Sequence, residues 1–236
     1  MLSLKILPLL CVLSLLAEPQ GPRTGEKPEM SYRYRSELIE GWTVHFQVEL
    51  DAQEDLQASV ARLLAVKLWE VSSRLPGDVV QRLQQVPIRM HLQREGCDGG
   101  VYHPAATWLK DHGYPEDWAR GVEFGNARNF LGWTRAQPSM VLHELSHAWH
   151  HQVLGYDHPG LRGAYETVKE SKRLEQVLYV TGGSKRAYAL NNEQEFFAEL
   201  SEAWWGTNDY FPFVKVEVMQ EFPDLPAVLG RAWQMP

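Results

Sequence analysis

The chain has 236 residues, of which 44% are hydrophobic and 22% are charged, and its formal net charge is −7. This length and apolar content suit one domain with a sizeable core, and they exclude a disordered protein. The acidic balance, without any basic run, argues against nucleic acid as the main partner, because phosphate binding relies on clustered Lys and Arg.

The N-terminal residues 1–17 have the layout of a secretory signal peptide. Lys5 precedes an apolar stretch from Ile6 to Ala17, and a polar, proline-rich segment begins at Glu18. The apolar stretch is too short to span a bilayer comfortably, so we expect a secreted or extracytoplasmic protein without a permanent membrane anchor. Residues 18–36 have the composition of a flexible arm. Cleavage near Ala17 would leave Cys97 as the only thiol, which excludes an intramolecular disulfide in the mature chain.

Residues 37–95 are predicted to form an N-terminal α+β layer. Apolar residues alternate with polar ones in its strands and recur at helical spacing in its helices. The predicted elements are a strand over 44–50, helices over 54–74 and 79–85, and a strand over 88–92. His45 and His91 fall on the polar phase of these strands, so both are expected at the surface.

Residues 96–236 are predicted to form the metal-binding part of the same single domain, 37–236. Pro138 suits the first turn of a helix that runs to about residue 155, and Asn191 or Asn192 suits the cap of a helix from Glu193 to Trp205. The other predicted elements are a helix near 107–112, a strand over 122–124, a helix over 161–172, and a hairpin with strands over 176–180 and 187–190.

The most specific motif is His143-Glu144-Leu145-Ser146-His147 in the helix that begins at Pro138. Histidines four residues apart lie on one helix face, so both imidazoles can reach one zinc ion, and Glu144 is offset towards a water on that ion. The plainer alternative is a surface helix with charged neighbours. His150 and His151 follow the motif and are expected to cover the outer side of the helix.

A catalytic zinc site needs a third protein ligand. The helix over 193–205 offers Glu195 and Glu199, which share one face; one can bind the metal while the other holds a ligand histidine by its remaining N–H. Without the histidine motif, the same helix could simply be an acidic solvated face. Asp209 is a weaker alternative, because its spacing after Gly206-Thr207 is one residue short of an aspzincin pattern.

The segment from Tyr188 to Glu199, set behind His143-Glu-Leu-Ser-His147, resembles the zinc-binding helix pair in the catalytic domain of anthrax toxin lethal factor and its relatives. That family belongs to the gluzincins of the zincin fold, and many of its members are secreted. The resemblance covers about residues 101–213, and the N-terminal layer has no counterpart in it. The resemblance implies an α+β zincin-like fold with Zn²⁺ as cofactor. It also implies a role for each of six residues: zinc ligands His143, His147 and Glu195, general base Glu144, oxyanion-stabilising Tyr188, and supporting carboxylate Glu199.

These patterns favour a secreted zinc metallohydrolase, most simply a peptidase that acts on a peptide or protein substrate. Zinc would acidify a bound water, Glu144 would accept its proton, and Tyr188 would donate to the oxyanion. Two alternatives stay open. One is a catalytically silent zincin-like protein with structural zinc and a partner-binding role, and the other is a zinc amidase for a non-protein substrate.

Overall fold

The computed structural model describes residues 32–234 of the chain. The predicted signal peptide, residues 1–17, lies outside the described residues, as does most of the predicted arm. The last three residues of that arm, 34–36, were assigned wrongly, because strand β1 (Tyr34–Ile39) already begins there. The register of β1 explains this early start: Tyr34 pairs with Gln47 and Ile39 with Trp42, so the strand matches its neighbour along its whole length.

Five strands form one mixed sheet in the order β1-β2-β3-β5-β4. After β1, the strands are β2 (Trp42–Gln47), β3 (Ile88–Met90), β4 (Gly100–Tyr102) and β5 (Val122–Phe124). β1 pairs antiparallel with β2, the pairs β2–β3 and β3–β5 are parallel, and β4 returns antiparallel along β5. The fold is therefore α+β, and the sheet joins strands from both parts of the chain that the sequence analysis separated at residue 95.

One face of the sheet is covered by helices. The longest is α1 (Glu54–Arg74), which buries Val60, Leu64, Leu68 and Val71. These residues recur at three- and four-residue steps and form the apolar stripe of an amphipathic helix. The helices packed around α1 are α2 (Gly77–Leu83), α4 (Ala127–Trp133) and α5 (Met140–Trp149).

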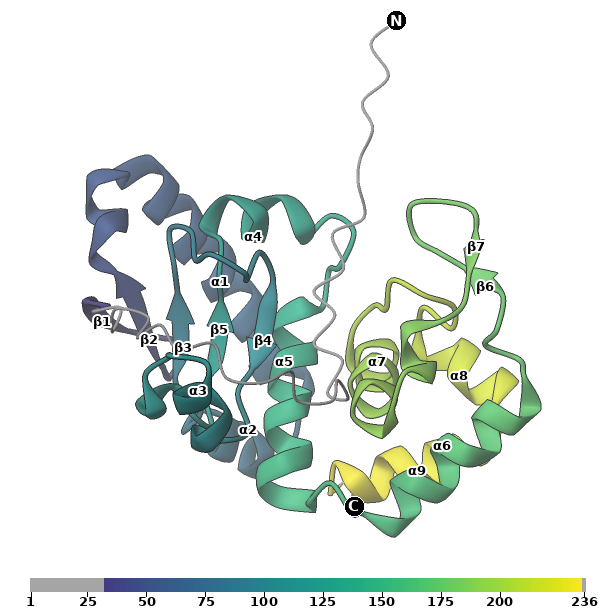
Figure 1. The fold of residues 1–236 in the computed structure, drawn as a ribbon. Coiled ribbons are helices and arrows are strands. Elements are labelled where there is room, and N and C mark those ends of the chain that lie inside the picture. The colour runs from purple at the N-terminus through teal and green to yellow at the C-terminus, as the bar shows by residue number, and fades with distance from the viewer. Residues whose placement is uncertain (1–31, 235–236) are drawn as a thin grey trace, which may run out of the picture.

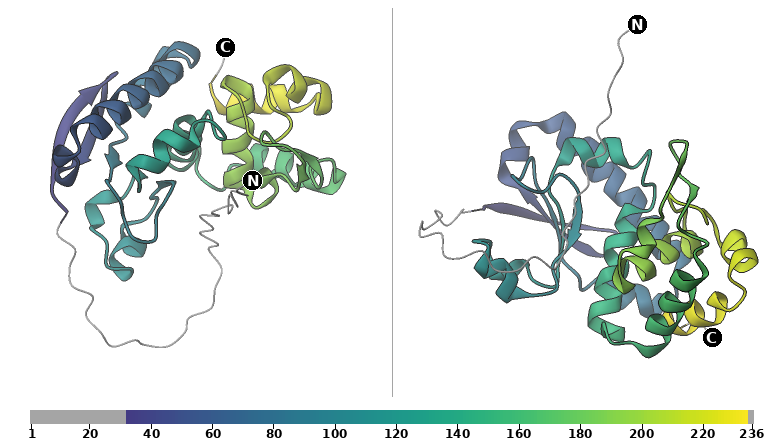
Figure 2. Two further views of the ribbon diagram at one scale, coloured as in Figure 1. Left: turned by 90° about the horizontal axis from the view of Figure 1, so that it is seen from above. Right: turned by 45° about the vertical axis from the view of Figure 1, so that its right-hand side comes forward.

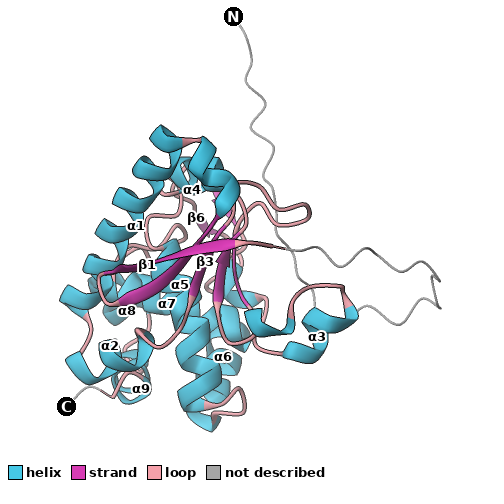
Figure 3. Ribbon diagram, turned by 90° about the vertical axis from the view of Figure 1, so that its left-hand side faces the viewer, coloured by secondary structure: helices cyan, strands magenta, loops and turns pink. Residues whose placement is uncertain are grey.

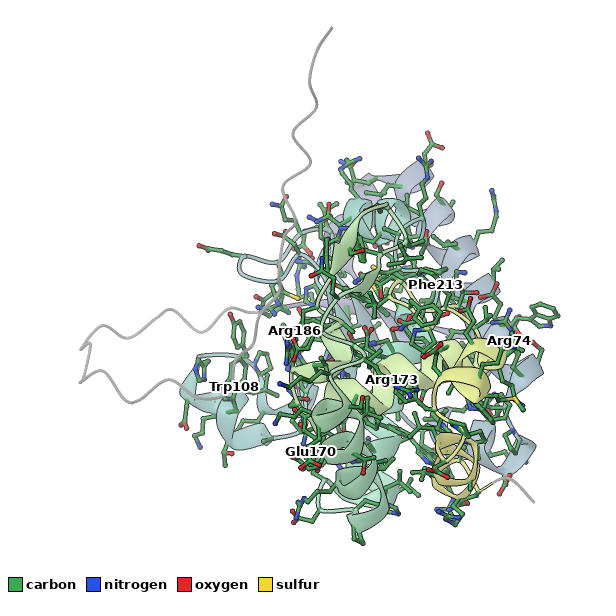
Figure 4. All side chains as sticks on the ribbon, turned by 90° about the vertical axis from the view of Figure 1, so that its right-hand side faces the viewer. Arg74, Trp108, Glu170, Arg173, Arg186 and Phe213 are labelled. Carbon is green, nitrogen blue, oxygen red and sulfur yellow. The ribbon has the colours of Figure 1, made fainter. Side chains whose placement is uncertain are left out.

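The connection between β4 and β5, residues 103–121, forms a small lobe on the other side of the sheet from α1 (Figure 3). This β4–β5 lobe contains α3 (Ala106–Asp111) and the short 3₁₀ helix η2 (Glu116–Trp118). Figure 4 shows Trp108 on the lobe, at the opposite side of that view from Arg74.

A buried carboxylate joins this lobe to the sheet. Glu123 of β5 is fully buried, accepts a hydrogen bond from Arg94, lies 2.7 Å from His103 Nε2 and lies 3.4 Å from His91 Nε2. The expectation that His91 lies at the surface is wrong, since its side chain is fully buried. The polar phase of β3 faces the lobe rather than solvent, and the alternation of the sequence could not distinguish the two.

The C-terminal half is built from helices and one short hairpin, on the far side of α5 from the sheet (Figures 1 and 2). Its elements are α6 (Pro159–Ser171), β6 (Val177–Leu178), β7 (Ser184–Lys185), α7 (Glu193–Trp205), α8 (Lys215–Glu221) and α9 (Leu225–Ala232). α5 packs directly against α7 and is tied to α9, because Trp149 Nε1 donates to the carbonyl of Ala232 at 2.9 Å.

Several predicted elements are confirmed and others are not. The helices predicted over 54–74 and 193–205 have those bounds, and the Asn192 side chain caps the second one by accepting from Glu195 N. The second hairpin strand, predicted over 187–190, is instead a 3₁₀ helix, η4 (Tyr188–Leu190). No helix within residues 32–234 combines the length and apolar character needed to cross a membrane.

Candidate metal centre

The histidine motif lies on α5, and its two faces have different environments. Leu142, Leu145 and Ala148 are buried in the core, whereas the side chains of His143 and His147 keep 13% and 12% exposure. The two imidazoles point towards α7, where Glu195 is 18% exposed. The helical spacing of the motif therefore places both histidines on one accessible face, as expected.

Three potential ligand atoms converge between α5 and α7. His143 Nε2 lies 3.1 Å from His147 Nε2 and 3.1 Å from Glu195 Oε2, and His147 Nε2 lies 3.3 Å from Glu195 Oε2. These residues form one of the groups within residues 32–234 whose donor atoms all lie close enough to hold a metal ion. The structure thus brings together the three residues that the sequence analysis named as zinc ligands.

The spacing and chemistry of these atoms fit a small cation. Zinc–ligand bonds of about 2.0–2.1 Å in tetrahedral geometry put neighbouring ligand atoms roughly 3.3–3.4 Å apart. The Nδ1–H of His143 donates to Glu202 Oε1 at 2.7 Å, so its Nε2 presents a lone pair to His147 and Glu195. Facing lone pairs and a carboxylate repel one another unless a cation or proton lies between them.

The carboxylate that supports His143 is Glu202, and not Glu199 as the sequence analysis expected. Glu199 Oε1 lies 3.9 Å from His143 Nδ1, beyond hydrogen-bond distance, whereas Glu202 Oε1 lies at 2.7 Å. Glu195, Glu199 and Glu202 recur at positions i, i+4 and i+7 of α7, so all three share one face. That i+7 spacing was the available signal for Glu202, and it was missed.

The acidic side chains behind His143 are buried. Glu199 and Glu202 are each 3% exposed and Asp209 is 2% exposed. Burial is the main cause that raises the pKa of both glutamates, and burial followed by the charge of Glu202 raises the pKa of Asp209 to about 7. Within residues 32–234, the groups whose ligand atoms converge do not include Asp209, so its position does not support the alternative third ligand.

Glu144 lies beside the edge strand β4. Its side chain rests against Gly100, where an added Cβ would come within 2.9 Å of Glu144 Oε1, so glycine makes room for the carboxylate. Burial raises the pKa of Glu144, and the nearby His143 and His147 oppose that rise. A hydrogen bond from the backbone of Tyr102, also on β4, orients the carboxylate.

Tyr188 lies on η4, immediately before α7, and is half-buried. Burial, and then the charge of Glu195, raise the pKa of its hydroxyl, which therefore stays protonated at neutral pH. Within the described part of the chain, no hydrogen-bond partner is found for this hydroxyl. A protonated donor close to Glu195 is available for a ligand.

His150 does not cover the outer side of the helix, and that expectation is wrong. The residue is fully buried, and its ring packs edge-on against Phe197 with centroids 5.2 Å apart. The backbone explains the difference, because α5 continues after Trp149 as a π-helix, η3 (His150–Leu154), which rotates the following side chains relative to an α-helical path.

Comparison of the chain with protein-family models, with curated proteins and with solved structures finds no match. The chemistry of the centre therefore has to be inferred from its own residues.

Proposed function

We propose that this protein is a zinc-dependent metallohydrolase that cleaves amide bonds in peptides. The observation that carries the proposal is the convergence of His143 Nε2, His147 Nε2 and Glu195 Oε2 within 3.1–3.3 Å of one another, with Glu144 on the same helix. Structural zinc sites take four protein ligands, whereas catalytic sites take three and keep one position for water. Three ligands converge here among the described residues.

When bound, zinc supplies a Lewis acid that acidifies water and polarises a carbonyl group. The chain's own residues would do the rest. Glu144 accepts the proton of the attacking water, and its raised pKa brings it closer to that task than an exposed glutamate. The hydroxyl of Tyr188 donates to the oxygen on which negative charge develops. Glu202 fixes the tautomer and ring orientation of His143 through Nδ1.

The position of the third ligand supports a gluzincin assignment as part of this proposal. Glu195 comes from a second helix that packs against the motif helix, and Tyr188 precedes it by seven residues, as the resemblance to the lethal factor family implies. We also propose that the chain has a zincin-like fold and that it is secreted after removal of residues 1–17.

The replacement Glu144→Gln tests the function directly. The variant keeps both histidines and Glu195, so it should bind zinc normally, and cleavage of a peptide library should fall by about 100-fold or more, as expected for loss of a general base. Glu193→Gln is a matched control, because Glu193 lies at the start of α7 and pairs with Arg162 of α6 rather than with the motif histidines.

Three results would each change the proposal in a different way. Unchanged cleavage by Glu144→Gln would refute Glu144 as the base. Zinc binding without cleavage of any peptide by the wild-type protein would favour the silent, structural-zinc alternative. Release of fragments from peptidoglycan, with no cleavage of the peptide library, would favour an amidase.

A further inference from the structure

We propose that Tyr156 is a second hydrogen-bond donor of this site, which holds a carbonyl oxygen of the peptide chain on the α5 side of the metal centre. This inference rests on the proposed function and adds a substrate-positioning residue that the sequence motifs do not contain.

The backbone that carries Tyr156 is set by the end of the motif helix. The π-helix η3 ends at Leu154, and Gly155 follows with φ of +79°, a left-handed conformation that favours glycine. The glycine ends the helical run eight residues after His147. Tyr156 follows it, and its ring packs back against His150 and His151 of the same run.

The ring of Tyr156 is held on two sides. Its centroid lies 5.1 Å from that of the buried His150 and 5.0 Å from that of His151. His151 Nδ1 in turn lies 2.8 Å from the hydroxyl of Tyr102, which also accepts a hydrogen bond from Gln152 Nε2 at 3.0 Å. The ring is fixed by packing and by a hydrogen-bonded neighbour, as a substrate-positioning residue must be.

The same contacts connect Tyr156 to the metal centre. Tyr102 belongs to β4 and orients Glu144 through its backbone. His151, which the ring of Tyr156 contacts, follows His147 by four residues, and its partner Tyr102 lies on β4, where Gly100 borders Glu144. Burial and neighbouring charges raise the pKa of Tyr156, so its hydroxyl stays protonated and can donate.

The hydroxyl also has free hydrogen-bonding capacity. Within residues 32–234 no hydrogen-bond partner is found for it, and it is not among the fully buried side-chain atoms that lack a partner. A protonated phenol donates to carbonyl oxygens and not to amide N–H groups. Tyr188, beside α7, and Tyr156, beside the end of α5, thus supply two donors from different elements, and the chemistry they share fits a peptide backbone.

The test measures binding and does not require turnover. An N-acetylated tripeptide hydroxamate offers a zinc-chelating group and peptide carbonyls, whereas acetohydroxamate offers only the chelating group. For the zinc-loaded Tyr156→Phe variant, the affinity for the tripeptide hydroxamate, measured by calorimetry, should fall by about 2- to 10-fold, the usual effect of one neutral hydrogen bond. Its affinity for acetohydroxamate and its zinc content should equal those of the wild type.

Tyr114→Phe is the matched control, because Tyr114 lies on the β4–β5 lobe and stacks on Trp118 rather than at the metal centre. Equal affinity of wild type and Tyr156→Phe for the tripeptide hydroxamate would overturn the inference and leave the proposed function intact. Failure of both hydroxamates to bind the zinc-loaded wild type would instead count against the proposed function itself, and this inference would fall with it.

Discussion

The imidazole of His143 is held from two directions. Its Nε2 faces His147 and Glu195, and its Nδ1–H donates to Glu202 at 2.7 Å. Burial alone would lower the pKa of His143, but the hydrogen bonds to Glu195 and Glu202 outweigh burial and raise it well above its ordinary value. The two carboxylates that favour a proton on His143 would also favour a metal cation there, because the proton and the cation each bring positive charge into a buried acidic setting.

Glu202→Gln should therefore weaken zinc binding. The amide can still accept from Nδ1–H but carries no charge, so the ring stays oriented while the ligand nitrogen becomes less basic. Loss of such a supporting carboxylate typically costs about 10- to 100-fold in metal affinity, which competition with a fluorescent chelator would measure. Glu199→Gln, 3.9 Å from Nδ1, should cost less.

The order of these two effects is the decisive observation. A larger loss of zinc affinity in Glu199→Gln than in Glu202→Gln would contradict the assignment of Glu202 and restore the sequence-based expectation. Glu193→Gln, on the same helix and paired with Arg162 at the surface, should leave affinity unchanged.

At the scale of elements, α5 and α7, the two helices that carry the candidate ligands, are joined at one end by a pair of hydrogen bonds, here called the clasp. The hydroxyl of Ser139, just before α5, accepts from the N–H of Thr207 at 3.0 Å and donates to the carbonyl of Thr207 at 2.9 Å. Gly206 makes this approach possible, since an added Cβ would lie only 2.4 Å from Ser139 Oγ. The clasp fixes the start of α5 against the end of α7 independently of any metal.

Ser139→Ala should destabilise the fold. Removal of the hydroxyl leaves the N–H and carbonyl of Thr207 without this partner at a site where Ser139 is only 7% exposed, at a cost of about 1–3 kcal/mol in the free energy of unfolding. Urea titration of the metal-free protein would measure it. Ser73→Ala removes an exposed hydroxyl that bonds only within α1 and should cost much less; equal losses in the two variants would rule out a special role for the clasp.

The sequence predicts the long elements better than the short ones, for physical reasons. α1 and α7 have an apolar stripe over 21 and 13 residues, and α7 also has the Asn192 cap, so local signals agree. The helices α4, α8 and α9 have 7, 7 and 8 residues and were not predicted. Isolated helices this short are not stable, so tertiary packing decides them. The π-helical turn at residues 150–154 was not predicted either.

The candidate site shows the same division. The spacing of His143, His147 and Glu195 on two helices could be read from the chain because helical periodicity fixes which residues share a face. The choice between Glu199 and Glu202 as the carboxylate that supports His143 could not be read in this way. Both follow Glu195 on one face of α7, and only the crossing of α5 and α7 selects one of them. The position of Tyr156 could not be predicted for a similar reason, since it depends on the turn at Gly155.

At the scale of the whole molecule, the sheet is covered differently on its two sides. Helices and an apolar core cover one side, whereas the β4–β5 lobe is attached to the other by a polar and aromatic network around Glu123. Trp118 of the lobe packs at 5.1 Å from His91 and at 6.0 Å from Tyr114, measured between ring centroids. The sequence predicted strands over 44–50, 88–92 and 122–124, which match β2, β3 and β5, but it did not predict β1. It also did not predict that 88–90 and 122–124 would pair, because partners 34 positions apart in the chain have no local signal.

This network predicts that acid destabilises the fold. Burial lowers the pKa of His91 to about 4, from about 6.5 in the unfolded chain, although Glu123 partly opposes that change. The unfolded state therefore binds more protons than the folded state between these two pH values. The contribution of His91 to the free energy of unfolding should be fully present above pH 6.5. It should fall towards pH 4, by at most about 1.4 kcal/mol per pH unit. Burial raises the pKa of Glu123, but the hydrogen bond from His103 and the charge of Arg94 outweigh it, so the net lowering extends the loss to still lower pH.

Substitution of His91 by Asn separates this effect from other acid-sensitive groups. Urea unfolding of wild type and His91→Asn at intervals from pH 7.5 to pH 4.5 gives two stability curves, and zinc release or titration of His45 would affect both curves alike. Whatever the variant costs at pH 7.5, its curve should be flatter than that of the wild type below pH 6.5, because a neutral amide binds no proton on unfolding. The protection factors for amide hydrogen exchange of residues 103–121 in the wild type, corrected for the intrinsic rate at each pH, should fall over the same range, since protonation of His91 loosens the contact with Trp118. Parallel stability curves, or protection factors in the lobe that do not change with pH, would show that His91 does not couple the attachment of the lobe to protons.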